Sequence, residues 1–401
     1  MSTDISKKLS PNILLLGLVS FLADASTHMI KPILPAFITA LGGSSLAVGG
    51  IGGLTESATS LLKVLSGYWS DRIRRRKPFL FLGYLTSAAA KLLFPLSTAW
   101  QHLLILMPAE RVGKGLRGAP RDALIAALVK EPVRGRGFGF HRAMDSAGAI
   151  IGSLAAFLLV TRFDLPVRSI LVVGAIVAFA AVAPIFAVRE KRRHEGSSDP
   201  PGLSLRGFSI PFYLFLIVAT IFGLGNFSYM FFILRALDVF GPNGSLGLTI
   251  LLYALINVTY AGLSVPAGAL SDRIGRKKVL LMGYGLFAAT CLGLVLARGW
   301  PDLFFLFALY GGFRALTDGP QRALVADLVP FEIRGTALGV FHTAVGLAAL
   351  PASLAAGALW QLAPRWTFLY GAALGLTAVV LLALLGRLGD SKKLSERKQT
   401  V

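Results

Sequence analysis

The sequence predicts an all-α membrane protein with twelve transmembrane helices in two pseudo-symmetric six-helix bundles. Three observations support this fold class. Hydrophobic residues make up 55% of the 401 residues and charged residues only 15%, whereas soluble domains carry about 25% charged residues. The chain contains twelve long apolar stretches, and a basic sequence between two of them recurs in the second half. An ordinary soluble domain is therefore excluded.

A membrane-spanning helix needs about 20 mostly apolar residues. The stretches of that kind are approximately 12–38, 46–69, 79–97, 101–121, 138–160, 168–188, 209–238, 246–270, 279–297, 301–320, 335–358 and 365–387. No small-residue cleavage site follows the first, which favours an uncleaved helix over a signal peptide. The single cysteine, Cys291, excludes an internal disulfide and a cysteine metal site.

The distribution of lysine and arginine predicts the orientation. If the N-terminus is cytoplasmic, 27 of the 40 Lys and Arg residues of the chain lie in cytoplasmic segments. The opposite loops then hold only Arg162, Arg168, Arg298 and Arg365. The positive-inside rule therefore predicts a multi-pass protein of the cell (inner) membrane with both termini in the cytoplasm. Because the net charge of +20 is mostly topological, we expect no nucleic-acid partner.

The longest polar connection between spans, residues 189–207, divides the chain. We predict an N-terminal six-helix bundle at 1–188, a cytoplasmic linker at 189–208, and a C-terminal six-helix bundle with a short tail at 209–401. The halves share residues in the same order: Gly67, Asp71, Arg72 and Ile73 with Gly268, Asp272, Arg273 and Ile274; Pro120, Ala123 and Leu124 with Pro320, Ala323 and Leu324; Arg134, Gly135 and Gly139 with Arg334, Gly335 and Gly339. Parallel six-helix repeats with a site between them are typical of transporters that work by rocking.

The repeated loops carry a family resemblance. GYWSDRIRRRK begins at Gly67 and GALSDRIGRKK at Gly268. Nearly the whole chain resembles a twelve-helix member of the major facilitator superfamily, whose loop signature is G-x-x-x-D-[RK]-x-G-[RK]-[RK]. The second copy fits throughout, whereas the first has Arg74 in place of the glycine. The resemblance implies a secondary transporter that works by alternating access.

The resemblance also implies a gate at the inner surface. Asp71 is expected to face the start of the eleventh helix, near Gly335 and Thr336, where free backbone N–H groups favour a carboxylate. Arg75 is expected to pair with Asp122, whereas Arg322 at the matching place in the second half argues against a second such link. The expected gating residues are Gly67, Asp71, Arg72, Arg75, Asp122, Gly268, Asp272, Arg273 and Arg276. The alternative is that the basic cluster only sets topology.

Charged residues inside the spans are functional candidates because burying charge in a membrane is costly. Arg111, Lys114 and Gly115 fit the superfamily pattern R-x-x-Q-G with Lys in place of Gln, which implies a role for Arg111 in proton coupling. Because Asp24 and Arg111 both lie near mid-membrane in the predicted spans, we expect Arg111 to be the base that lies close to Asp24 while Asp24 is ionised. A structural pair of Arg111 with Glu110 is the alternative. The expected proton-coupling or substrate residues are Asp24, His28, Lys31, Glu56, Arg111, Lys114, Arg117 and Asp145.

Spacing supports several of these choices. Asp24, His28 and Lys31 share one face of the first helix, and a carboxylate such as Asp24 or Glu56 at mid-membrane suits proton binding and release. A neutralising network with Lys63 is the alternative for Glu56. Lys91 is expected to extend toward the outer surface. The pairs expected from helical spacing are Arg142–Asp145, Arg235–Asp238 and Arg314–Asp318.

Small residues and prolines predict local packing. Gly139, Gly148 and Gly152 fit the glycine spacing of superfamily antiporters, although Ser153 replaces the usual proline. Glycines at such positions let two helices approach closely. Pro32 and Pro35 are expected to bend the first helix.

The function that follows is proton-coupled antiport that exports a small organic solute. The alternative is proton-coupled symport or exchange of an organic anion, because the intramembrane charges of the first half are mostly basic. Metal-ion transport through Asp24 and His28 and a non-transporting receptor are less favoured. No catalytic motif is present, so we expect no enzyme activity, no cofactor and no resident metal. We expect a monomer whose partners are lipid, protons and an anionic or zwitterionic small molecule.

Overall fold

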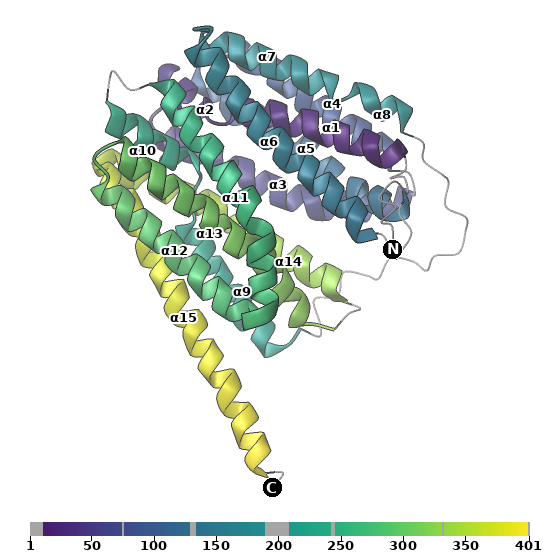
Figure 1. The fold of residues 1–401 in the computed structure, drawn as a ribbon, viewed down its shortest axis with the longest axis vertical. Coiled ribbons are helices and arrows are strands. Elements are labelled where there is room, and N and C mark those ends of the chain that lie inside the picture. The colour runs from purple at the N-terminus through teal and green to yellow at the C-terminus, as the bar shows by residue number, and fades with distance from the viewer. Residues whose placement is uncertain are drawn as a thin grey trace, which may run out of the picture. The chain divides into compact units, whose positions relative to one another are not determined.

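The computed structural model describes residues 11–73, 76–128, 134–188, 208–241, 245–330 and 333–399. Within these ranges, 63–73, 127–128, 134–136 and 386–399 are described by their backbone only. All regular secondary structure in the described ranges is helical (Figure 1), so the predicted all-α class is confirmed.

Each predicted span coincides with one helix or with two helices in tandem. The first half contains α1 (Pro11–Ile30), α2 (Leu34–Ala40), α3 (Ser45–Ile73), α4 (Lys77–Leu93), the short 3-10 helix η1 (Phe94–Leu96), α5 (Trp100–Leu128), α6 (Arg134–Thr161), α7 (Val167–Ala180) and α8 (Ala183–Ala187). The second contains α9 (Ile210–Gly225), α10 (Met230–Phe240), α11 (Leu246–Ile274), α12 (Arg276–Leu296), α13 (Trp300–Asp327), α14 (Arg334–Leu362) and α15 (Pro364–Gln399). Nine helical stretches in the described chain are long and apolar enough to cross a membrane.

Three of the spans are divided between two α-helices. The span 168–188 divides between α7 and α8. α1 ends at Ile30 and α2 begins at Leu34, as expected from Pro32 and Pro35, because proline removes a helical N–H and clashes with the preceding turn. The span 209–238 was expected to be continuous, but it breaks between α9 and α10. There the backbone N–H of Ser228 donates to Ser353 Oγ on α14 at 3.1 Å, which satisfies a polar group that the break frees.

The chain divides into two compact units. Unit 1 comprises Met1–Phe37 and Ala58–Pro200, and unit 2 comprises Ile38–Ser57 and Pro201–Val401. The first part of α3 therefore packs in unit 2, where Ser57 Oγ donates to the Gly346 carbonyl of α14 at 2.6 Å. The bundle and linker boundaries drawn from the sequence remain predictions.

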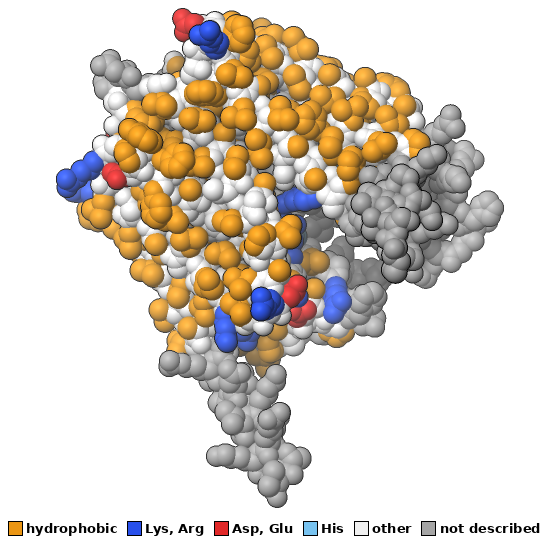
Figure 2. Space-filling model, in the orientation of Figure 1, with side chains coloured by type: hydrophobic (Ala, Val, Ile, Leu, Met, Phe, Trp, Pro, Cys, Tyr) orange, Lys and Arg blue, Asp and Glu red, His pale blue; other side chains and the backbone are white. Residues whose placement is uncertain are grey.

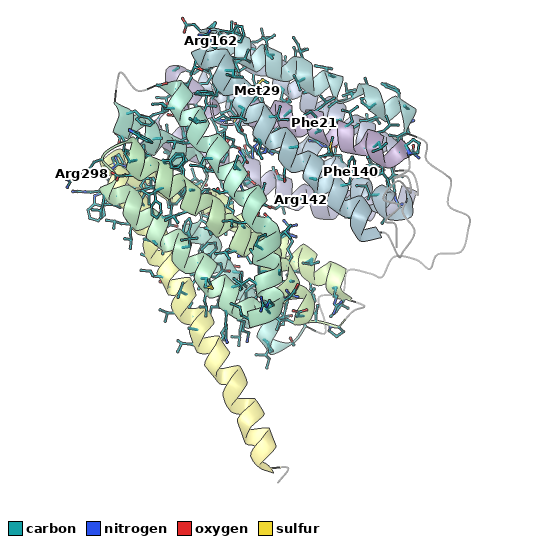
Figure 3. The ribbon with its side chains drawn as sticks, viewed as in Figure 1. Phe21, Met29, Phe140, Arg142, Arg162 and Arg298 are labelled. Carbon is teal, nitrogen blue, oxygen red and sulfur yellow. The ribbon has the colours of Figure 1, made fainter. Side chains whose placement is uncertain are left out.

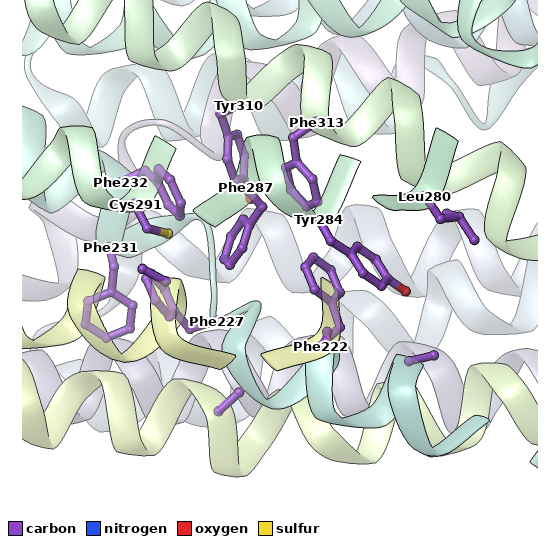
Figure 4. Close-up of a cluster of buried hydrophobic side chains, with 14 of the residues drawn as sticks. Phe222, Phe227, Phe231, Phe232, Leu280, Tyr284, Phe287, Cys291, Tyr310 and Phe313 are labelled. Carbon is purple, nitrogen blue, oxygen red and sulfur yellow. The ribbon is translucent and has the colours of Figure 1, made fainter. Parts of the chain in front are cut away.

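Unit 2 has an aromatic core. α9, α10, α12 and α13 bring together buried rings (Figure 4). Phe222 stacks on Tyr284 with ring centroids 3.9 Å apart, and Phe232 lies 4.1 Å from Tyr310. On the outside, hydrophobic side chains are spread across the visible face of the described chain (Figure 2), as expected for a surface in contact with lipid tails.

In unit 1, α1 packs against α6 and α4 against α5. Figure 3 labels Phe21 and Phe140 on the first pair of helices. A Cβ atom added to Gly152 would lie 2.1 Å from the Ala25 carbonyl oxygen, and one added to Gly148 would lie 2.3 Å from that of Phe21. The close helix approach predicted from these two glycines is confirmed. A Cβ atom at Gly139 would meet nothing within 4 Å.

We expect Gly152→Val to destabilise unit 1 by about 1–3 kcal/mol, because α1 and α6 must separate to accept the side chain. Thermal unfolding of the purified protein in detergent measures the effect. Gly139→Ala is the matched control on the same helix and should be neutral or slightly stabilising, since alanine favours helix over glycine. Equal unfolding temperatures for Gly152→Val and the original protein would contradict the close packing.

Candidate functional site

A row of charged side chains runs along one face of α5 in unit 1. Glu110, Lys114, Arg117 and Arg121 recur at helical spacing, which places them on one side of the helix. Glu110 is only 4% exposed and Arg117 only 3%. Residues of α1, α4 and α6 complete the row, which we call the unit 1 charge cluster.

The most accessible pair of this cluster joins α1 to α5. Lys114 Nζ lies 3.8 Å from Asp24 Oδ1, and these side chains are 34% and 18% exposed. The structure thus brings together two of the predicted coupling residues. Arg111 was the base expected beside Asp24, but Lys114 occupies that place. His28 follows Asp24 by one helical turn and is half-buried.

Arg111 forms an ion pair with its neighbour Glu110, with 3.2 Å between Arg111 Nε and Glu110 Oε2. The pair named in the alternative for Arg111 is therefore present, and the role of Arg111 in proton coupling stays a prediction. Lys91 of α4 reaches the other carboxylate oxygen, with its Nζ 3.8 Å from Glu110 Oε1. Since only 2% of Lys91 is exposed, the prediction that it extends to the outer surface is wrong. Lys91 Nζ donates hydrogen bonds to the hydroxyl groups of Ser26 and Thr27, which hold the side chain inside unit 1.

Arg117 connects α5 to α4. Its guanidinium donates to Ser87 Oγ at 2.6 Å and to the Gly83 carbonyl at 3.2 Å. It also lies 4.1 Å from the ring centroid of Tyr84. These contacts favour a structural role for Arg117 over direct solute contact.

Asp145 of α6 contacts two groups that the sequence did not single out. Ser20 of α1 donates to Asp145 Oδ1, and His141 Nδ1 lies 3.6 Å from Asp145 Oδ2. Arg121 of α5 donates to Ser20 Oγ at 3.3 Å. The i, i+4 spacing of His141 and Asp145 in the sequence could have indicated this contact. Arg142, the partner predicted for Asp145, has an exposed side chain (Figure 3).

Comparison with known proteins adds the family. The family model described as Major Facilitator Superfamily matches residues 16–262 and 215–400. The chain belongs to the major facilitator superfamily. An uncharacterized MFS-type transporter of Methanocaldococcus jannaschii is 44% identical over 379 residues, 94% of this chain and 95% of the relative. The multidrug resistance protein MdtH of Aeromonas hydrophila is 24% identical, with 92% and 93% covered.

Solved structures show the same fold. The nucleoside transporter NupG superposes with a TM-score of 0.75 at 14% identity, covering 94% of this chain and 99% of NupG. The POT family transporter PepTSo gives 0.78 at 13% identity, with 95% and 98% covered. The human organic anion transporter MFSD10 gives 0.62 at 19% identity, with 93% and 100% covered. Because the chain belongs to the major facilitator superfamily, it is a multi-pass membrane transporter of small solutes.

The superfamily loop signature is described in its second copy. Gly275 separates α11 from α12 with φ of +98°, a conformation that glycine adopts without strain. Arg276 forms an ion pair with Asp272, and its Nε lies 3.3 Å from Asp327 Oδ2 at the end of α13. The expectation that the second half lacks an Arg–Asp link is therefore wrong, because Asp327 supplies the acid that Arg322 could not.

The first copy lies outside what the structure describes in detail. Gly67, Asp71 and Arg72 fall in the part of α3 described by its backbone only, and Arg75 lies outside the described residues. The contacts predicted for Asp71 and Arg75 therefore stay predictions. Asp122 is exposed and accepts from Arg121 at 3.1 Å.

The remaining candidates are not members of the unit 1 charge cluster as defined above. The pair Arg314–Asp318, with 3.7 Å between Nη2 and Oδ2, and the pair Arg235–Asp238 are confirmed. Lys31 is half-buried and follows α1, and Glu56 has an exposed side chain on α3. Among the described residues, no group of three or more His, Cys, Asp or Glu could hold a metal ion.

Proposed function

We propose that this transporter exports a small organic solute across the cell membrane in exchange for protons, with both termini in the cytoplasm. The observation that carries the proposal is the partly exposed pair of Asp24 and Lys114. A carboxylate beside an ammonium group stays ionised, whereas one that loses its cation in a low-dielectric setting takes up a proton. Displacement of Lys114 by a solute or by helix movement would thus couple solute binding to proton binding at Asp24. The multidrug resistance name of the Aeromonas hydrophila relative supports export.

An anionic or zwitterionic solute fits the charge of unit 1. Lys91, Arg111 and Arg117 are each at least 95% buried, and Glu110 is the acid buried with them in the described chain. Unbalanced buried charge is costly, and an anion would offset it. The second candidate function, symport or exchange of an organic anion, rests on this surplus, and the fold shared with the organic anion transporter MFSD10 agrees with it.

Proteoliposomes that contain the pH dye pyranine test the proposal. A library of small carboxylates, zwitterions and organic cations is added outside, and the internal pH is followed. Antiport moves protons out as a solute enters, so the internal pH rises for at least one anion or zwitterion. A fall in internal pH beyond that in empty liposomes would instead support symport. If no solute changes the internal pH more than in empty liposomes, proton coupling fails.

A further inference from the structure

Lys91 is held inside unit 1 by two hydroxyl groups whose hydrogens are already committed. Ser26 Oγ donates to the Gly174 carbonyl at 2.6 Å, and Thr27 Oγ1 donates to the Ala23 carbonyl at 2.8 Å. A hydroxyl group has one hydrogen to donate and two lone pairs. Both oxygens must therefore accept from Lys91 Nζ, which lies 3.0 Å from Ser26 Oγ and 2.8 Å from Thr27 Oγ1.

These two acceptors satisfy two N–H groups of Lys91. The carboxylate oxygen next to it, Glu110 Oε1, lies 3.8 Å away, which is too far for a hydrogen bond. That oxygen is buried and accepts no hydrogen bond within the described chain. An ammonium group has three N–H groups and a neutral amine has two. The two hydroxyl groups therefore accept both N–H groups of a neutral Lys91 amine. If Lys91 is an ammonium group, its third N–H group has no acceptor within hydrogen-bond distance and is directed at Glu110.

The acids near Lys91 are already paired with other cations. The charged groups that act on Lys91 are Glu110, Arg111 and Arg117 of α5 and Asp24 of α1. Asp24 is already paired with Lys114, and Glu110 is paired with Arg111. An ionised Lys91 would thus add positive charge to a buried region in which the nearest acid is already used, which burial penalises.

We propose that Lys91 is a proton-exchanging residue of this transporter and that Glu110 accepts and passes on its proton. An N–H bond of the Lys91 ammonium breaks, its electron pair stays on Nζ, and the proton goes to Glu110 Oε1, directly after a small side-chain movement or across one water molecule. Protonation of Glu110 removes the negative charge that faces Arg111, so a negatively charged group of a solute is attracted more strongly to this region. Release of the proton from Glu110 restores its pair with Arg111 and leaves Lys91 neutral. This inference rests on the proposed proton coupling and adds a second exchanging group to Asp24.

The direct test needs no substrate. The full-length protein is labelled with ¹⁵Nζ-lysine and titrated by NMR in nanodiscs from about pH 6 to pH 9, a range in which ordinary lysines, with pKa values of about 10.4, stay charged. One lysine signal should change from the ammonium to the amine shift. That signal should be absent from Lys91→Arg, and in Glu110→Gln it should titrate at a lower pH. If every lysine signal keeps the ammonium shift up to pH 9, the inference is overturned.

Transport provides the second arm. Proton movement in the pyranine assay should fall about tenfold or more in Lys91→Arg, which always carries a charge, and in Lys91→Met, which never does. Lys77→Arg is the matched control on the same helix, because Lys77 Nζ also donates to two oxygens, the carbonyls of Phe186 and Val188 at 2.9 and 2.8 Å. Both Lys91 variants must elute from size exclusion as the original protein does.

The two arms separate this inference from the proposed function. A titrating Lys91 in a protein whose transport ignores the pH gradient would refute proton coupling and leave the lysine assignment standing. Transport that follows the pH gradient equally well in Lys91→Arg would refute the role of Lys91 and leave the proposed function standing.

Discussion

Asp24→Asn is expected to abolish solute movement driven by a pH gradient, while exchange of solute at equal pH persists in part. Asparagine keeps the size and polarity of the side chain, but its amide group does not bind and release a proton near neutral pH. A loss of about tenfold or more in gradient-driven transport is expected, since coupling free energies of this kind are typically 1–3 kcal/mol. Pyranine-loaded proteoliposomes measure the rate of transport driven by the pH gradient. Exchange of isotope-labelled solute at equal pH measures the rate of solute exchange without a gradient.

Asp238→Asn is the matched control for this experiment. Asp238 also pairs with an arginine on a membrane helix, but its side chain is 44% exposed and belongs to unit 2. Its variant should couple normally. If Asp24→Asn still concentrates solute on a pH gradient, Asp24 is not the coupling carboxylate. Asp145, which contacts Ser20 and His141, or Glu56 would then be the better candidate.

Features that depend on local sequence were predictable. A span needs only apolar length, so the helices follow the predicted stretches. The break between α1 and α2 follows from the backbone chemistry of proline. Gly148 and Gly152 recur at helical spacing, and spacing of that kind is enough to indicate a helix contact.

Features that depend on packing between distant helices were not predictable. Lys91 reads from sequence as a lysine near a helix end, and its burial depends on Ser26 and Thr27, about 65 residues earlier in the chain. The acid that binds Arg276 is Asp327, five residues beyond the position that the internal repeat indicated. An internal repeat predicts which backbone positions of the two halves correspond. Which side chains contact each other across a loop also depends on the residue at which each helix ends.

The unit 1 charge cluster shows the same limit for function. From sequence, Arg111 and Asp24 were coupled because both lie near mid-membrane. Depth alone does not decide which base faces which acid, because α5 presents successive residues to different neighbours. In the structure Arg111 pairs with Glu110, and Lys114 pairs with Asp24. Glu110, Arg111 and Lys91 form a buried group, whereas Asp24 and Lys114 form a partly exposed pair.

Glu110→Ala is expected to have the largest effect on stability. Glu110 lies within 4 Å of both Lys91 and Arg111, and its removal leaves the buried guanidinium of Arg111, which cannot lose its charge, without this acid. Breaking a buried ion pair from one side costs about 3–5 kcal/mol, because the remaining charge is uncompensated.

Thermal unfolding in detergent measures the loss of stability in Glu110→Ala. Glu56→Ala is the control, since Glu56 is exposed and surface substitutions usually change stability by about 0.5 kcal/mol or less. If Glu110→Ala unfolds at the same temperature as Glu56→Ala, Glu110 does not hold the charge of Arg111 in the folded protein.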